Sequence, residues 1–354
     1  MPLQSELEAS LHLGTSFIST ISPVLRTQQT VHELHPPRRG LHIGSDQLHP
    51  LTIDSKDLFD SFAQTQAGLS NDLGFANNFI WMSRMSGFYA LIDDCFCLFA
   101  LNGNVLSLLL PPLGDVGKQA GALKHCFDIM DTYNQGSGDS AVEFVDQEFV
   151  LNHGLEKGSD HWSLEPQFDD YVYLTCDLIE LSGNAYKNKR NEINQFLRAY
   201  PSYRLERLES RHHEGIRDLL GLWVSDRLRG MQGASVVSFI ETVELERMSI
   251  ERALHHYDAL GLEGLCLVID GRIEGFTLGE RITGKVASIL IEKTNFAITG
   301  AAQFLFREFS RSLSDCPYTN VGDDLGLENL RRVKMSYRPA LFGEKMTLRR
   351  NAPA

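Results

Sequence analysis

Three short segments of this sequence combine side chains that could bind or activate a charged substrate. In the first, Arg190 and Asn191 follow Lys187 by three and four positions, which places all three on one face of a helix. Ammonium, guanidinium and amide groups donate hydrogen bonds, so this face would suit phosphate oxygens or a carboxylate. A charged helix face exposed to water, with no ligand, is the alternative interpretation.

The second segment is the apolar run of residues 289–293, which predicts a buried strand that ends in Glu292 and Lys293. Neighbouring residues of a strand face opposite ways, so these two side chains cannot both point into one pocket. An acid at the end of a buried strand can have a raised pKa and act as a general base. The alternative is a strand end in contact with water.

The third segment, residues 320–338, predicts a strand, a sharp turn and a helix. Asp323 and Asp324 lie between two glycines in the turn, close to the start of the helix. The helix carries a row of basic residues three and four positions apart, namely Arg331, Lys334 and Arg338. A purely structural turn is the alternative interpretation of the two acids.

Tyr337 closes this third segment. Pro339 disfavours helical geometry at Arg338, so we expect the helix to end near Tyr337. The phenol would then lie at a helix end, where it could give a proton to a leaving oxygen. A core aromatic residue whose hydroxyl merely finds a partner is the alternative.

The elements that must position these residues fall into four parts. Residues 1–50 are rich in proline and histidine and lack a helical or strand period, which predicts a mobile leader with solvated histidines and no metal site. Residues 51–181 predict a mixed α/β domain, and residues 182–202 a linking basic helix that Pro201 stops. Residues 203–354 predict a second α/β domain.

Within these parts the sequence predicts individual elements. Before residue 182 we expect helices at 56–65 and 121–133, a hairpin within 87–110, and strands at 142–147 and 171–174. From Tyr203 the predicted order is β, α, α, β, β, β, α, β, α, β, which ends in a strand at 345–349. That order is used by the GNAT acyltransferase fold, a mixed sheet whose central strands splay apart.

Composition limits the class of protein. The chain has 354 residues, 43% hydrophobic and 22% charged, which is typical of a globular protein of about two domains. Neither a membrane-spanning run nor a secretory signal is visible, so we expect a cytoplasmic protein. The net charge of -13 divides into -16 for residues 1–180 and +3 for the rest, which suggests either an anionic ligand for the second half or a solvated acidic surface on the first.

The three segments together resemble a known family. LSGNAYKNKRNEINQF, a strand ending IEKTN, and NVGDDLGLENLRRVKMSYRP are similar to successive signatures of the phosphatidylglycerol lysyltransferase C-terminal-like family, and the likeness covers about residues 51–350. The resemblance implies two tandem GNAT-like acyltransferase domains, of which the first is degenerate. It also implies transfer of an aminoacyl group from aminoacyl-tRNA to an amine or hydroxyl acceptor by direct attack.

The resemblance further implies a role for each residue of the site. Glu292 would be the general base, Asp324 the partner of the donor's α-ammonium group, and Tyr337 the proton donor. The donor or its phosphates would contact a basic and polar set, namely Lys187, Lys189, Arg190, Asn191, Lys293, Arg331 and Lys334. We expect no tightly bound cofactor and no metal.

The expected partners are tRNA and a small-molecule, peptide or lipid-headgroup acceptor, without DNA. An acyl-CoA-dependent N-acyltransferase and a non-catalytic binding protein are the alternatives. Acetyl-CoA members of the GNAT fold cradle pyrophosphate with a glycine-rich loop, whereas the matching stretch here, residues 294–301, keeps only Gly300. A helix N-terminus binds anions even without that loop, so acyl-CoA stays open as a donor.

Overall fold

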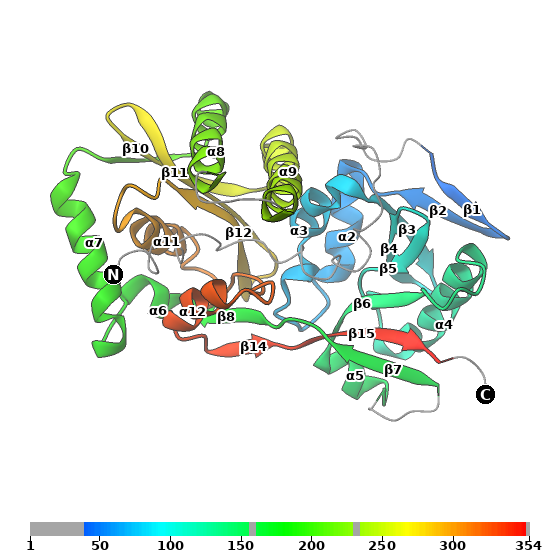
Figure 1. The fold of residues 1–354 in the computed structure, drawn as a ribbon. Helices are drawn as coiled ribbons and strands as arrows, with labels where there is room; N and C mark the ends of the chain where they lie inside the picture. Colours follow the sequence, from blue (N-terminus) through cyan, green and yellow to red (C-terminus); the bar gives the residue numbers. More distant parts are fainter. Residues whose placement is uncertain (1–38, 156–160, 229–233, 352–354) are drawn as a thin grey trace. The chain divides into compact units, whose positions relative to one another are not determined.

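A computed structural model describes residues 39–155, 161–228 and 234–351, so most of the predicted leader lies outside the described residues. The described chain forms two compact units. We call Asp170–Phe342 the C-terminal unit, and the described residues before it together with those from Gly343 the N-terminal unit. Each unit contains one mixed β-sheet with helices, which confirms the predicted mixed α/β class (Figure 1).

The N-terminal unit is built on an eight-stranded sheet in the order β1-β2-β3-β4-β5-β6-β15-β7. Its strands are β1 (Leu41–Ile43), β2 (Asp46–Pro50), β3 (Ser86–Ile92), β4 (Cys95–Asn102), β5 (Val105–Leu108), β6 (Ala141–Asp146), β7 (Trp162–Pro166) and β15 (Lys345–Arg350). Its helices are α2 (Lys56–Ala63), α3 (Phe75–Trp81), α4 (Val116–Tyr133) and α5 (Gln147–Asn152). The core forms where α4 packs on β4 and β5.

The C-terminal unit is built on a seven-stranded sheet in the order β14-β8-β13-β12-β11-β10-β9. Its strands are β8 (Asp170–Leu174), β9 (Arg204–Arg207), β10 (Glu263–Ile269), β11 (Arg272–Arg281), β12 (Val286–Thr294), β13 (Tyr318–Asn320) and β14 (Leu341–Gly343). Its helices are α6 (Thr175–Glu180), α7 (Lys187–Ala199), α8 (His213–Leu228), α9 (Ala234–His255), α10 (Tyr257–Leu260), α11 (Ala301–Ser312) and α12 (Glu328–Ser336). Helix α11 packs on the sheet and against α6 and α7.

Local sequence signals explain many of these boundaries. Helix α7 ends two residues before Pro201, which cannot continue a helix. Asp270 and Gly271 both have positive φ and form the tight turn between β10 and β11. The predicted order of elements from Tyr203 is found as far as α12, except that the short helix α10 follows α9.

The leader prediction is wrong for residues 41–50. These residues form the β1-β2 hairpin, and β2 pairs with β3 at His49 and Pro50. The hairpin buries Ile43 and Leu48 in the core of the N-terminal unit. Its strands are too short to show a period in the sequence, and they are stabilised by pairing with a distant segment.

The predicted domain limits differ from the two units at both ends. The strand expected at the end of the first domain is β8, which pairs with β13, whereas the final strand, β15, pairs with β6 and β7. A buried ion pair between Lys345 and Asp72 also fixes the start of β15 in the N-terminal unit. The helix expected to link the domains is α7, whose Phe196 stacks on Phe304 of α11 in the C-terminal unit.

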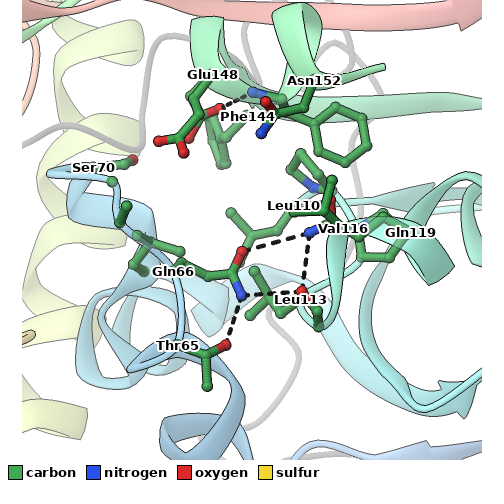
Figure 2. Close-up of a pocket in the computed structure, with 18 residues that line it drawn as sticks. Thr65, Gln66, Ser70, Leu110, Leu113, Val116, Gln119, Phe144, Glu148 and Asn152 are labelled. Carbon is green, nitrogen blue, oxygen red and sulfur yellow. Dashed lines mark hydrogen bonds between the residues drawn. The ribbon is translucent and has the colours of Figure 1, made fainter.

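One parallel strand pair occurs in each sheet among the described pairings, β5 with β6 and β12 with β13. Strand β12 pairs with β13 from Val286 to Ser288 only, although it continues to Thr294. The pairing ends at Ser288 because β13 itself ends at Asn320. In the N-terminal unit, the segment that follows β5 and the starts of α4 and α5 line a pocket of about 150 Å³ (Figure 2).

Candidate active site

Glu292 lies on the part of β12 that no longer pairs with β13. Its side chain is 6% exposed, and its Oε2 atom has no hydrogen-bond partner. Burial raises the pKa of the Glu292 carboxyl well above its ordinary value. A buried carboxyl oxygen without a partner is costly for a fold, and a raised pKa is what a general base needs near neutral pH.

Thr277 is the cross-strand neighbour of Glu292, on β11. Its hydroxyl is buried and also lacks a partner. Directly opposed residues of an antiparallel pair project from the same face of the sheet. Two unsatisfied polar groups therefore share one face where β12 leaves β13, and a bound ligand could satisfy both.

Tyr337 follows α12 directly, so the predicted end of that helix is confirmed. The residue is buried in the core, where its ring contacts Phe306, and its carbonyl accepts a hydrogen bond from the Tyr186 hydroxyl at 2.9 Å. Burial raises the pKa of the Tyr337 phenol, and the Glu292 carboxyl contributes to the rise. The two groups thus lie within electrostatic reach of each other, although Tyr337 is more enclosed than its position at a helix end predicts.

Two basic residues of α7 approach this region differently. The Lys189 ammonium lies over the Tyr337 ring, 4.5 Å from its centroid. Arg190 instead bonds the Leu181 and Gly183 carbonyls, which join α7 to the segment that precedes it. Lys187 and Asn191 are exposed on the same helix. Lys189 is therefore the α7 residue that the structure brings to Tyr337.

Lys293 points to the other face of β12, as the strand period predicts. Its ammonium forms an ion pair with Glu246 of α9 at 2.8 Å and lies 4.2 Å from the centroid of the Trp223 ring. The side chain is buried, so this charge is engaged within the fold. Of the pair at the end of the strand, Glu292 is the residue on the side of Tyr337.

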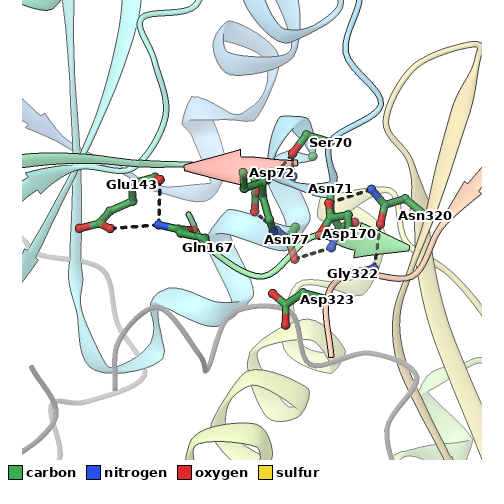
Figure 3. A network of polar contacts seen from close by, with 12 residues as sticks. Ser70, Asn71, Asp72, Asn77, Glu143, Gln167, Asp170, Asn320, Gly322 and Asp323 are labelled. Atoms are coloured by element: carbon green, nitrogen blue, oxygen red, sulfur yellow. Dashed lines mark hydrogen bonds and ion pairs between the residues drawn. The ribbon is translucent and has the colours of Figure 1, made fainter. Parts of the chain in front are cut away.

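Asp324 lies in the turn between β13 and α12, where both of its carboxylate oxygens are already hydrogen-bonded. Its two carboxylate oxygens accept hydrogen bonds from the Tyr171 hydroxyl at 2.6 Å and from the Gly326 N–H at 2.9 Å. Nearby, Asn320 donates to Asp170 at 2.9 Å and accepts from the Gly322 N–H at 2.7 Å (Figure 3). These bonds hold the turn between β13 and α12, which favours a structural role for Asp324.

Lys334 is fully buried beneath this turn. Its ammonium donates to the carbonyls of Val321 at 2.7 Å, Gly322 at 3.1 Å and Asp323. An ammonium group has three N–H donors, so it can donate to each of these carbonyls. The predicted role of Lys334 in phosphate binding is therefore corrected to one in holding the turn. Arg331 lies on the same helix but is exposed.

The N-terminus of α11 is covered by α7. Gly300 is the N-cap of α11 and has a φ of 83°, a left-handed conformation that favours glycine. A Cβ atom at this position would collide with the Glu192 carbonyl oxygen of α7. Residues 294–301, the stretch expected to match the pyrophosphate loop of acetyl-CoA enzymes, therefore end against backbone of the same unit.

Sequence reasoning missed Thr277, Phe306 and Tyr186. Thr277 and Phe306 lie outside the segments singled out by charge or spacing, whereas Tyr186 lies within the first segment but was given no role. The register of β11 against β12 places Thr277 beside Glu292, and Phe306 of α11 and the Tyr186 hydroxyl both contact Tyr337. No helix in the described part of the chain is long and apolar enough to cross a membrane.

Comparison with known proteins gives one family match. The family described as phosphatidylglycerol lysyltransferase, C-terminal, matches residues 66–348. A conserved protein of unknown function from Bacteroides thetaiotaomicron is 26% identical, with a TM-score of 0.76 over 86% of this chain and 99% of that chain. No curated protein sequence matched.

Two further solved structures share the fold at lower identity. The C-terminal domain of a putative lysylphosphatidylglycerol synthetase from Agrobacterium fabrum is 14% identical, with a TM-score of 0.58 over 85% of this chain and 93% of that chain. L-PGS from Bacillus licheniformis is 13% identical, with a TM-score of 0.58 over 84% and 92% of the respective chains.

Proposed function

Because the chain belongs to the phosphatidylglycerol lysyltransferase C-terminal family, we propose that it is an acyltransferase that moves an aminoacyl group from aminoacyl-tRNA to an amine or hydroxyl. The observation that carries the proposal is the buried Glu292 carboxyl, with its raised pKa and its unsatisfied oxygen beside Thr277. Such a group is poised to take a proton from an attacking nucleophile. The proposal also assigns a GNAT-like fold to both units. The sheets support it, because the order from β2 to β7 repeats the order from β9 to β14, with the parallel pair at the same place in each.

In the proposed reaction, the acceptor nitrogen or oxygen attacks the ester carbonyl carbon of the donor while Glu292 takes the acceptor's proton. The resulting tetrahedral intermediate collapses when the bond to the ribose oxygen breaks, and Tyr337 gives that oxygen a proton. The buried position of both groups in one core supports this pairing. No nucleophilic serine or cysteine is needed, because the donor ester is already activated.

A tRNA donor is preferred to acyl-CoA for a structural reason. The N-terminus of α11 lies against the α7 backbone at Glu192, so a pyrophosphate would have to displace α7 to reach it. The exposed Lys187, Asn191 and Arg331 remain for contacts with a phosphate backbone. The aspartate expected to bind the donor's ammonium, Asp324, joins the mechanism only if a donor displaces one of its present partners.

The experiment measures transfer of labelled lysine from lysyl-tRNA to phosphatidylglycerol micelles, the acceptor named by the family, and to hydroxylamine as a small nucleophile. We expect Glu292→Gln to lower turnover by about 10²–10⁴-fold, the usual contribution of a general base. Glu143→Gln is a matched control, because burial also raises the pKa of Glu143, which lies on β6 of the N-terminal unit.

Turnover with acetyl-CoA but not with any aminoacyl-tRNA would overturn the donor assignment in favour of acyl-CoA. Equal loss of turnover in Glu292→Gln and Glu143→Gln would remove Glu292 from the mechanism. A pH profile supplies a second readout, since turnover should fall as the pH drops below the raised pKa of Glu292.

A further inference from the structure

The pocket of the N-terminal unit occupies the same place in its sheet as the Glu292 region does in the other sheet. Each lies just beyond a parallel strand pair. In the N-terminal unit this pairing ends at Leu108 and Val142, and in the C-terminal unit it ends at Ser288 and Asn320. Open α/β sheets bind ligands in the crevice beyond the carboxyl ends of such strands. The pocket measures about 150 Å³ and so admits a ligand of about six non-hydrogen atoms.

Charge in this pocket is one-sided. Asp146 and Glu148 line it, whereas no lysine, arginine or histidine among the described residues does. Asp146 caps α5 through its Oδ1 atom, which accepts a hydrogen bond from the Phe149 N–H at 2.8 Å. Burial raises the pKa of the Asp146 carboxyl, and no ion pair joins it to a basic residue in the described part of the chain. A cationic ligand would supply the missing countercharge.

The rest of the lining separates into an apolar wall and a polar end. Leu110, Leu113 and Phe144 form part of the wall. Gln66 and Gln119 lie across the pocket from Glu148 and share the Gly114 carbonyl as acceptor, at 3.5 Å and 3.4 Å (Figure 2). The amide groups are thus already bonded within the fold. The carboxylates are left to select the ligand's charge, and the wall suits an alkyl chain.

We propose that this pocket is a binding site for a small aliphatic ammonium compound, held by Asp146 and Glu148 through its charge and by the apolar wall through its chain. The site is separate from the acyl-transfer residues, and the proposal does not depend on the proposed function. Binding can therefore be measured without turnover.

The experiment titrates the whole protein with n-pentylammonium, pentan-1-ol and pentanoate by calorimetry or ligand-observed NMR. These probes have similar length and differ in charge. We expect n-pentylammonium to bind at least about tenfold more tightly than either of the others, because a partly buried charge pair discriminates strongly between ligands. Equal affinity for the three probes, or no binding of n-pentylammonium at millimolar concentration, would overturn the proposal.

Two variants test the location. Asp146→Asn keeps an oxygen that can cap α5 but removes the charge, and should weaken n-pentylammonium binding at least about tenfold. Gly68→Ala adds a methyl group 3.4 Å from Asp146 Oδ2 and should weaken all three probes by filling space. Glu165→Gln, on the exposed part of β7, is the control and should change nothing. Unaltered binding in both pocket variants would place the ligand elsewhere.

Discussion

Lys334 and Glu292 are both buried ionisable residues of the C-terminal unit, but their surroundings are opposite. The Lys334 ammonium donates to three backbone carbonyls of the turn between β13 and α12. The Glu292 carboxyl has an oxygen without a partner and lies where β12 has left its neighbour. A buried charge whose bonds are complete holds a fold together, whereas an incomplete one marks where a ligand can bind.

The largest expected effect is on stability, in Lys334→Met. This change leaves three buried carbonyls without their shared donor, so we expect a loss of about 3–5 kcal/mol in the free energy of unfolding. Urea denaturation measures it. Arg331→Met, on the exposed side of the same helix, should stay within about 0.5 kcal/mol. A Lys334→Met protein that is stable but has lost turnover would contradict the structural role of Lys334, because it would place Lys334 in the active site.

Tyr337 lies close to both Lys334 and Glu292. Removing its hydroxyl tests whether it acts in the reaction or only packs in the core. If the phenol protonates the leaving oxygen, Tyr337→Phe should lower kcat by about 10²-fold with little change in KM. Tyr173→Phe is the matched control, because the Tyr173 hydroxyl donates to the Lys334 carbonyl at 2.9 Å. That variant should lose about 1 kcal/mol of stability and keep its kcat. An unaltered kcat in Tyr337→Phe would make Tyr337 a core residue only.

The burial of Glu292 should make the stability of the protein depend on pH. Burial raises the pKa of Glu292 in the folded protein above the ordinary 4.5, so the folded state keeps a proton that the unfolded state has lost. Stability therefore falls as the pH rises from about 4.5 to the folded pKa. Glutamine is neutral throughout and escapes this loss.

We expect Glu292→Gln to exceed the wild type in stability by about 0.5–2 kcal/mol above that pH interval, a typical gain when a strained site residue is replaced. Below pH 4.5 the two should converge. Urea unfolding between pH 4 and pH 8 measures the difference, with the exposed Glu165→Gln as the control. A difference that is constant with pH would refute the assignment of a buried, unsatisfied acid.

The smallest expected effect concerns the exposed basic side chains. Arg331→Ala should reduce the slope of log affinity for tRNA against log salt by about 1, as for the loss of one phosphate contact. Filter binding over a range of salt concentrations measures this slope. Arg190→Ala should change it less, because Arg190 already bonds the Leu181 and Gly183 carbonyls. Equal changes in slope for the two variants would mean that Arg190 leaves the Leu181 and Gly183 carbonyls when tRNA binds.

Much of the fold was predictable because its signals are local. Pro201 ends α7, Pro339 lies just after α12, and the pair Asp270 and Gly271 forms its turn, all through constraints on one or two residues. The strand period also separated Glu292 from Lys293. The β1-β2 hairpin escaped prediction because its stability comes from pairing with β3, a segment distant in the chain.

The sequence by itself determined most elements from Tyr203 to α12, the family and the position of Glu292 at the end of a buried strand. Only the tertiary structure decided which basic residues are engaged within the fold, since the carbonyls that surround Lys334 come from residues 11 to 13 positions away along a turn. It also decided that β8 pairs in the sheet of the C-terminal unit and β15 in the sheet of the N-terminal unit. Local patterns specify how a strand alternates, but the choice of its neighbour depends on register and burial between distant segments.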